Sequence, residues 1–208
     1  MNRVTIETRN ENQFDLLLRY KSIFCPGCHM IRVKDLRAAN PDMQIFESRY
    51  GQNFQMLMPV YWQNRRFFLD ECLYNYVVYP DSLSRSGEGQ IDTALINRGE
   101  YQRIIHNTLD RLQMPEQVRK RYKRETTEAD ALYRFMLGIQ YDRPELAVSE
   151  YASLGEQDKK RLKIRWLYHV ARAGKIGTLH SVQNRIQAVK HSTPLKPLRL
   201  LVRRLREL

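Results

Sequence analysis

The sequence predicts an α+β protein, in which a small mixed N-terminal domain with a Cys-x-x-Cys knuckle is followed by a basic C-terminal helical bundle. One observation behind this is a change of pattern. Short β-branched and aromatic segments fill residues 1–80, and helical spacing dominates from residue 99. The other observation is charge. The 208 residues have a net charge of +12, yet residues 1–100 hold 12 basic and 12 acidic side chains. Residues 101–208 hold the other 23 basic and 11 acidic side chains, so the whole excess lies in the helical half.

The N-terminal domain, residues 1–80, is expected to combine short strands with a few helical turns. Asn, Gly and Pro residues separate its apolar segments, which is typical of strands joined by turns. A short helix is expected over residues 14–20, while residues 72–78 fit a helix or a buried strand equally well. The expected strands cover residues 4–8, 45–47, 56–62 and 66–69.

Residues 81–98 are expected to form a linker or long loop. Their first half, residues 81–89, contains three Ser and two Gly, and such residues pack poorly and add backbone freedom. The second domain then covers residues 99–208, where five or six helices are expected to form a compact bundle. Within it, Asp142 is expected to cap a helix whose first turn contains Pro144.

A long amphipathic helix is expected to run from a capping box at Ser153 and Glu156 to Ala173. Two stripes recur along it at helical spacing, one apolar and one mainly cationic. The apolar stripe, expected to face the core, consists of Leu162, Trp166 and Val170. The second stripe consists of Arg161, Arg165, Tyr168 and Arg172. Trp62 is also expected in a core.

Three basic clusters make the second domain a candidate nucleic-acid-binding surface, because a concentrated positive field attracts polyanions. The alternative is that each cluster is simply the solvated face of a helix. No RNA-recognition signature, Gly-x-x-Gly clamp or two-Cys, two-His finger is present, so the sequence does not support base-specific readout. The candidate contact residues are Arg119, Lys120, Arg121, Lys123, Arg124, Lys159, Lys160, Arg161, Arg165, Arg172, Lys196, Arg199, Arg203 and Arg206.

The cysteines permit two chemistries. Cys25 and Cys28 are separated by a Pro-Gly turn, so their thiolates can chelate one zinc ion, with Cys72 as a third ligand. A structural zinc site needs four ligands, and the sequence does not identify the fourth. The competing interpretation is thiol redox chemistry at the same pair.

The redox interpretation rests on a resemblance over about 60 residues. Ile23 and Phe24 lead into the Cys25–Cys28 motif, a helix is expected from His29 to Ala39, and Met58-Pro59 follows. This order resembles glutaredoxins and the related glutathione transferases. The resemblance implies that Cys25 is the nucleophile, and that Pro59, placed before a strand, and Glu71 hold glutathione.

The layout of the whole chain carries a second resemblance. A neutral α+β half with Cys25 and Cys28, joined to basic helices, resembles the small version of the large subunit in type IV CRISPR effector complexes. The resemblance implies a subunit at the 5′ end of a guide RNA in antiviral defence. Such a subunit contacts neighbouring backbone subunits and helps to recognise and open target duplex DNA without cutting it.

We therefore expect a non-enzymatic nucleic-acid-binding subunit of a ribonucleoprotein, with RNA or DNA and other protein subunits as partners. A thiol enzyme and a DNA-binding transcription regulator are the alternatives. No apolar run approaches the ~18 residues of a membrane span, and the polar first dozen residues do not read as a secretory signal. Three cysteines do not suggest a disulfide framework, so a cytoplasmic location without membrane attachment is expected.

Overall fold

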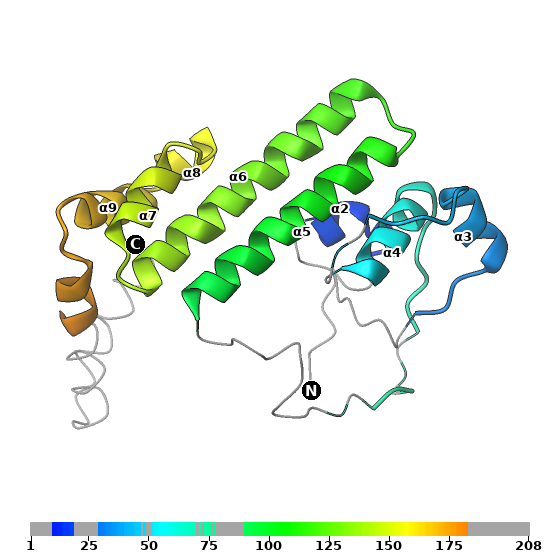
Figure 1. Ribbon diagram of the computed structural model, residues 1–208, viewed down its shortest axis with the longest axis horizontal. Coiled ribbons are helices and arrows are strands. Elements are labelled where there is room, and N and C mark those ends of the chain that lie inside the picture. Colours follow the sequence, from blue (N-terminus) through cyan, green and yellow to red (C-terminus); the bar gives the residue numbers. More distant parts are fainter. Residues whose placement is uncertain are drawn as a thin grey trace. The chain divides into compact units, whose positions relative to one another are not determined.

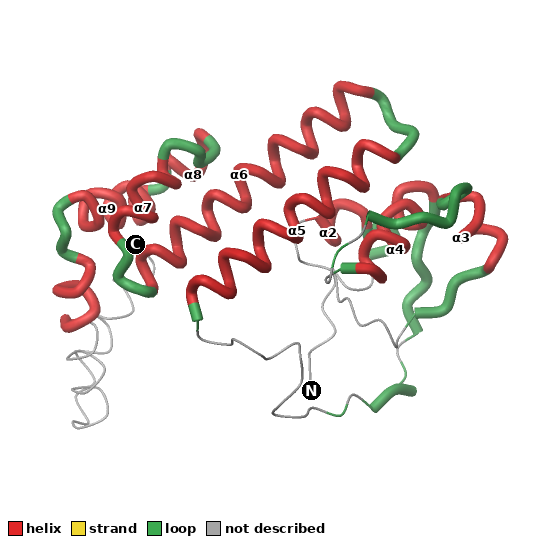
Figure 2. The backbone as a smooth tube through the Cα atoms, viewed as in Figure 1, coloured by secondary structure: helices red, strands yellow, loops and turns green. Residues whose placement is uncertain are grey.

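The described part of the chain is helical. The computed structural model describes residues 10–18, 29–46, 48, 51–69, 71, 73–75, 77 and 90–182. Within these residues there is no strand (Figures 1 and 2). The predicted α+β class is therefore wrong for this part of the chain. Residues 56–62, an expected strand, lie inside a helix, while residues 45–46 and 66–69 have no regular structure. The expected strand at residues 4–8 lies outside the described residues.

Five helices form the first part of the fold. They are α2 (Phe14–Leu18), α3 (Val33–Ala39), α4 (Gln52–Gln63), α5 (Ile91–Arg111) and α6 (Glu116–Gln140). The short helix expected over residues 14–20 is present as α2 up to Leu18, and residues 19–20 lie outside the described residues.

The chain divides into two compact units, Met1–Thr126 and Thr127–Leu208, so the boundary falls within α6. This division differs from the expected one, which placed a linker at residues 81–98. Residues 91–98 form the first two turns of α5, whereas residues 81–89 lie outside the described residues. The expected second domain, residues 99–208, therefore shares α5 and the first half of α6 with the N-terminal unit.

An aromatic cluster holds the core of the first unit. The Phe14 ring lies 5.0 Å from Trp62 and 5.3 Å from Tyr122, which joins α2, α4 and the start of α6. The Tyr122 hydroxyl donates a 2.7 Å hydrogen bond to Asp15 Oδ1. Aliphatic side chains from α4 and α5, including the fully buried Ile104, complete this core.

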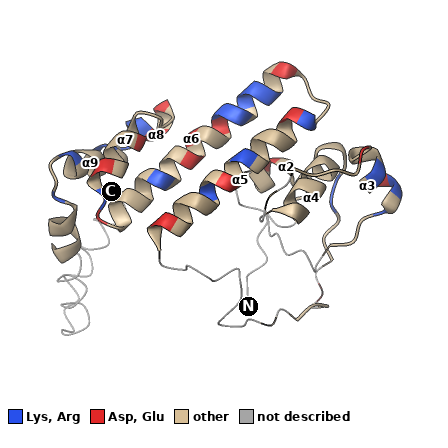
Figure 3. Cartoon of the chain, in the orientation of Figure 1, with Lys and Arg blue, Asp and Glu red and all other residues tan. Residues whose placement is uncertain are grey.

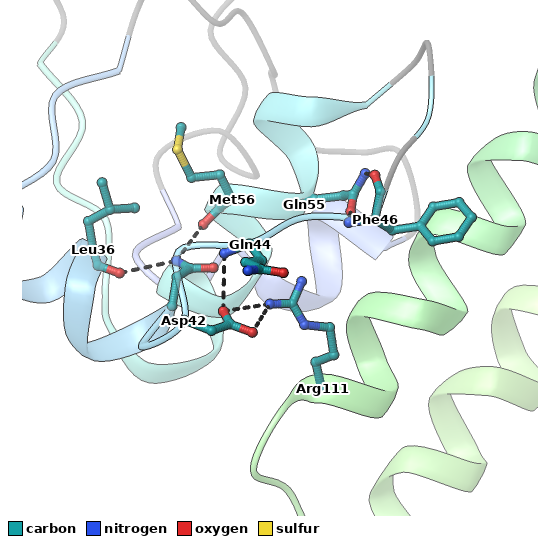
Figure 4. Close-up of polar contacts among 8 residues, drawn as sticks. Leu36, Asp42, Gln44, Phe46, Gln55, Met56 and Arg111 are labelled. Carbon is teal, nitrogen blue, oxygen red and sulfur yellow. Dashed lines mark hydrogen bonds and ion pairs between the residues drawn. The ribbon is translucent and has the colours of Figure 1, made fainter.

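Side-chain hydrogen bonds to α3, α4 and α5 hold the loop between α3 and α4 in place (Figure 4). The buried Asn40 donates to the carbonyls of Leu36 and Met56, both at 3.1 Å, and so joins the end of α3 to α4. Asp42 accepts two 2.7 Å hydrogen bonds from the Arg111 guanidinium at the end of α5. A hydrogen bond from the backbone N–H of Gln44, together with the Arg111 charge, lowers the pKa of the Asp42 carboxyl.

Gln55 holds the next part of this loop by pairing with one backbone residue. Its side-chain oxygen accepts from the Phe46 N–H at 2.7 Å, and its side-chain nitrogen donates to the Phe46 carbonyl at 3.0 Å (Figure 4). Gln55 itself is buried in α4. Because both backbone groups of Phe46 are satisfied, this segment needs no neighbouring strand.

The second unit contains the end of α6 and three shorter helices. These are α7 (Pro144–Tyr151), α8 (Glu156–Lys160) and α9 (Leu162–Arg172), and residues 176–182 are also helical. Their core is made by Ala131, Phe135, Ile139, Ala147, Leu154, Ile164, Leu167, Ala171 and Ile176.

α6 and α7 approach closely at one glycine. A Cβ added to Gly138 would lie 2.7 Å from the backbone nitrogen of Ala147 and 3.0 Å from its Cβ. Ala147 is fully buried, so neither helix has room to adjust by moving a flexible side chain. The helix crossing therefore depends on the missing side chain at position 138.

The glycines of α5 and α6 provide a matched pair of substitutions. We predict that Gly138→Ala destabilises the protein by about 1–3 kcal/mol, because the new methyl group must push α6 away from α7. Gly99→Ala, where no atom lies within 4 Å, should instead stabilise it by about 0.5–1 kcal/mol through helix propensity. Thermal unfolding followed by far-UV circular dichroism measures both. Equal shifts of the two variants would contradict the close approach.

The Tyr122–Asp15 hydrogen bond makes stability depend on alkaline pH. Burial, and then the Asp15 carboxylate, raise the pKa of Tyr122 from 10 to about 12. Because the folded pKa lies above the unfolded one, the stabilisation is complete below pH 10 and is lost as the pH rises toward 12.

We therefore predict that Tyr122→Phe costs roughly 1–2 kcal/mol at neutral pH. The difference in unfolding free energy between this variant and the wild type should shrink above about pH 10. Urea unfolding at a series of pH values tests this. A difference that stays constant up to pH 12 would contradict the assigned hydrogen bond.

Candidate nucleic-acid interface

The basic segment after residue 158 folds as two helices and not as one. α8 ends at Lys160, and Arg161 is extended, with φ −67° and ψ 123°, before α9 begins at Leu162. The predicted single helix from Ser153 to Ala173 is therefore interrupted. The interruption places three consecutive cations, residues 159–161, at the junction of the two helices.

The core face of α9 consists of Ile164, Leu167 and Ala171, which are all buried. Tyr168 lies beside this face and stacks on Tyr151 of α7, with ring centroids 3.9 Å apart and planes 17° apart. The stack therefore adds an aromatic contact between α9 and α7 beside the buried aliphatic face.

The predicted apolar stripe of α9 is therefore on the wrong face. Leu162 is 70% exposed and Trp166 is 51% exposed, while Val170 is partly buried. Trp62, by contrast, packs against the first core, as expected. Tyr168, expected in the cationic stripe, serves packing instead. We name the outer face of α9 as the exposed residues Leu162, Lys163, Arg165, Trp166, His169 and Arg172.

Gly174 ends α9 and turns the chain. Its φ is +65°, and its N–H donates to the Ala171 carbonyl while the Lys175 N–H donates to the Val170 carbonyl. This pair of bonds is a Schellman motif, which satisfies the last carbonyls of the helix. The motif leaves the exposed Lys175 directly after α9.

The cations of α8 and α9 differ in their partners. Lys159 pairs with Glu156 at 3.1 Å and Arg161 with Asp158 at 2.9 Å. Among the described residues, Lys160, Arg165 and Arg172 are exposed and form no ion pair. The predicted contact residues of this segment thus divide into paired and unpaired cations.

Sequence reasoning missed three residues here: Lys163 and Lys175 have the same unpaired character, and Trp166 is exposed between cations. One signal in the sequence marks the segment. Residues 159–206 contain 14 Lys and Arg residues and no Asp or Glu. Because this stretch has no acidic residues, its basic side chains find no acidic partner within the stretch, whichever side of its helices faces the core.

The cluster at residues 119–124 lies on the first half of α6 as a block of basic residues, with acidic residues before and after it (Figure 3). Arg119 donates to the carbonyls of Leu109 and Leu112 and so completes the end of α5. Three further cations of this cluster form ion pairs: Lys120 with Glu116 at 2.7 Å, Arg121 with Glu125 at 3.8 Å and Lys123 with Asp110 at 2.7 Å. The side chain of Arg124 is exposed.

Several predicted site residues lie outside the described residues. These are Lys196, Arg199, Arg203, Arg206 and the three expected zinc ligands Cys25, Cys28 and Cys72. Across the ranges that the structure describes, no three His, Cys, Asp or Glu side chains are grouped to hold a metal.

The residues expected to hold glutathione do not have the predicted setting. Pro59 is buried inside α4 instead of preceding a strand, because residues 56–62 are helical. Glu71 is exposed and lies in irregular backbone. Of the histidines, His106 forms a 3.2 Å hydrogen bond with Thr126 in the first unit, which is a structural role.

Comparison with known proteins does not assign this chain to a family. Among the helices that the structure describes, none combines the length and the apolar character needed to cross a bilayer. No protein-family model, no curated protein and no solved structure matches the chain.

Proposed function

We propose that the chain is a non-enzymatic nucleic-acid-binding protein, and that the outer face of α9 is part of its binding surface. The observation that carries the proposal is a set of exposed cations, Lys160, Lys163, Arg165, Arg172 and Lys175, that form no ion pair within the described residues. They belong to a segment, residues 159–206, that contains no acidic side chain. Such a segment keeps its positive potential at the surface, where a polyanion can reach it.

The two basic regions of the chain differ in what a phosphate can gain from them. On α6, a phosphate would have to compete with Glu116 for Lys120 and with Asp110 for Lys123. On α9, Arg165 and Arg172 hold no ion pair within the described residues. A phosphate that binds them displaces only water and counterions, and the release of counterions drives the association.

The setting that we propose is a ribonucleoprotein. Its support is the basic helical half, which is the part of the type IV CRISPR large-subunit layout that the described helices retain. The α+β half of that layout is absent from the described residues. Purification under increasing salt, with sequencing of any RNA retained by the protein, tests this setting separately from binding itself.

We predict that the triple variant Lys163→Gln, Arg165→Gln, Arg172→Gln weakens binding of a single-stranded oligonucleotide by roughly 100-fold at ~50 mM salt. Losing three phosphate contacts should also reduce the slope of log K against log salt by about 2. Fluorescence anisotropy of a labelled strand, titrated at several salt concentrations, measures both quantities. A labelled duplex of the same length, titrated in parallel, distinguishes a single-strand binder from a duplex-binding regulator.

The matched control removes the same charge from cations that already have acidic partners. In the triple variant Arg32→Gln, Arg65→Gln, Arg103→Gln, the lost pairs are surface contacts with Asp35, Glu11 and Glu100. Exposed pairs of this kind contribute little to stability, so this variant should fold and bind nearly as the wild type does. Equal weakening in both triple variants would mean that net charge alone attracts the strand and that α9 is not the site.

A further inference from the structure

An exposed indole lies among the unpaired cations of α9. Trp166 is 51% exposed, although the core of its unit is complete without it, because Ile164, Leu167 and Ala171 supply the packed face. The only other tryptophan of the chain, Trp62, packs on Phe14 and donates to the Gln113 carbonyl at 3.2 Å. Trp166 is therefore the more exposed of the two tryptophans.

Helix geometry places charged side chains around this ring. Residues three and four apart on a helix have Cβ atoms about 5–6 Å apart, so His169 is a neighbour of both Trp166 and Arg165. Arg172 continues the row of Arg165 two turns further on, and Lys163 lies on the opposite flank. Residues 159–182 themselves contain no Asp or Glu.

We propose that Trp166 stacks on an unpaired base, and that the outer face of α9 therefore prefers single-stranded nucleic acid. This inference rests on the proposed function and names its ligand. An aromatic ring beside cations is the arrangement by which proteins hold single strands, since every base has a π-face and the cations follow the backbone. In a duplex both faces of each base are covered by stacking, so only an unpaired base offers a face to Trp166.

The charges argue for this occupant over an apolar protein surface. A helical partner docking on Leu162 and Trp166 would have to desolvate Arg165, His169 and Arg172 or supply acidic residues to pair with them. A nucleic-acid strand supplies a base and phosphates together. The base would pack on the apolar part of the outer face, and the phosphates would pair with its cations.

The test compares two substitutions that keep an apolar side chain but differ in aromaticity. Trp166→Leu should weaken binding of an oligothymidine strand by about 5- to 150-fold, the range found when stacking on one base is lost. Trp166→Phe should retain part of the affinity. Neither should change the salt slope, because no phosphate contact is removed. Ile96→Ala, which removes an exposed apolar side chain from α5, is the control and should leave binding unchanged.

An abasic strand of the same length separates stacking from charge. The wild type should bind oligothymidine more tightly than the abasic strand, and Trp166→Leu should bind both equally. Equal affinity of wild type and Trp166→Leu for oligothymidine would overturn the stacking proposal while leaving the proposed function intact, whereas a wild type that binds neither the single strands nor the duplex would overturn both.

Two further results would also overturn the stacking proposal. One is equal loss of affinity in Trp166→Phe and Trp166→Leu, which would indicate shape packing instead of stacking. The other is a change of oligomeric state in Trp166→Leu, measured by sedimentation, with unchanged affinity for the strand. That result would mean that a second copy of the chain covers Trp166. Since Trp166 lies outside the buried core, the variants should keep the melting temperature of the wild type.

Discussion

The stack of Tyr168 on Tyr151 is the contact on which the chemistry of the C-terminal unit depends. α9 has two apolar faces, and both have the spacing of a core face. The aromatic pair holds one of them against α7, and Ile164 and Leu167 are buried in the core on the same side. The other face, with Trp166, is then left to water and to whatever the cations beside it attract. A single packing choice thus decides which residues of this helix are structural and which are available for binding.

The chain uses its positive charge in two different ways. In the first unit the cations stabilise the contact between α5 and α6. Arg119 donates to a carbonyl at the end of α5, and Lys123 pairs with Asp110. In the C-terminal unit the cations outnumber the carboxylates within reach, and Arg165 and Arg172 remain without ion pairs among the described residues. Net charge counts both kinds equally. The positions of the carboxylates show whether the cations of a basic surface already have acidic partners.

Predictions from the sequence were more accurate for the helices of the C-terminal unit than for the N-terminal half. Residues 56–62 form a continuous apolar run, and periodicity cannot distinguish such a run as strand or helix. The helix becomes evident only when Phe54 and Tyr61 are seen to share the spacing of one buried face. Of the candidate site, the cationic residues were predictable from composition. The exposure of Trp166 was not, because it depends on Tyr151, a residue on another helix.

The pairing of Gln55 with Phe46 also has a consequence for the behaviour of the protein at high concentration. Extended backbone with free N–H and C=O groups is a template on which other chains can add, and this is the usual route to aggregation by edge pairing. At Phe46 both groups are already engaged by one side-chain amide. A buried glutamine on α4 thereby leaves the backbone of Phe46 with no free group on which another chain could pair.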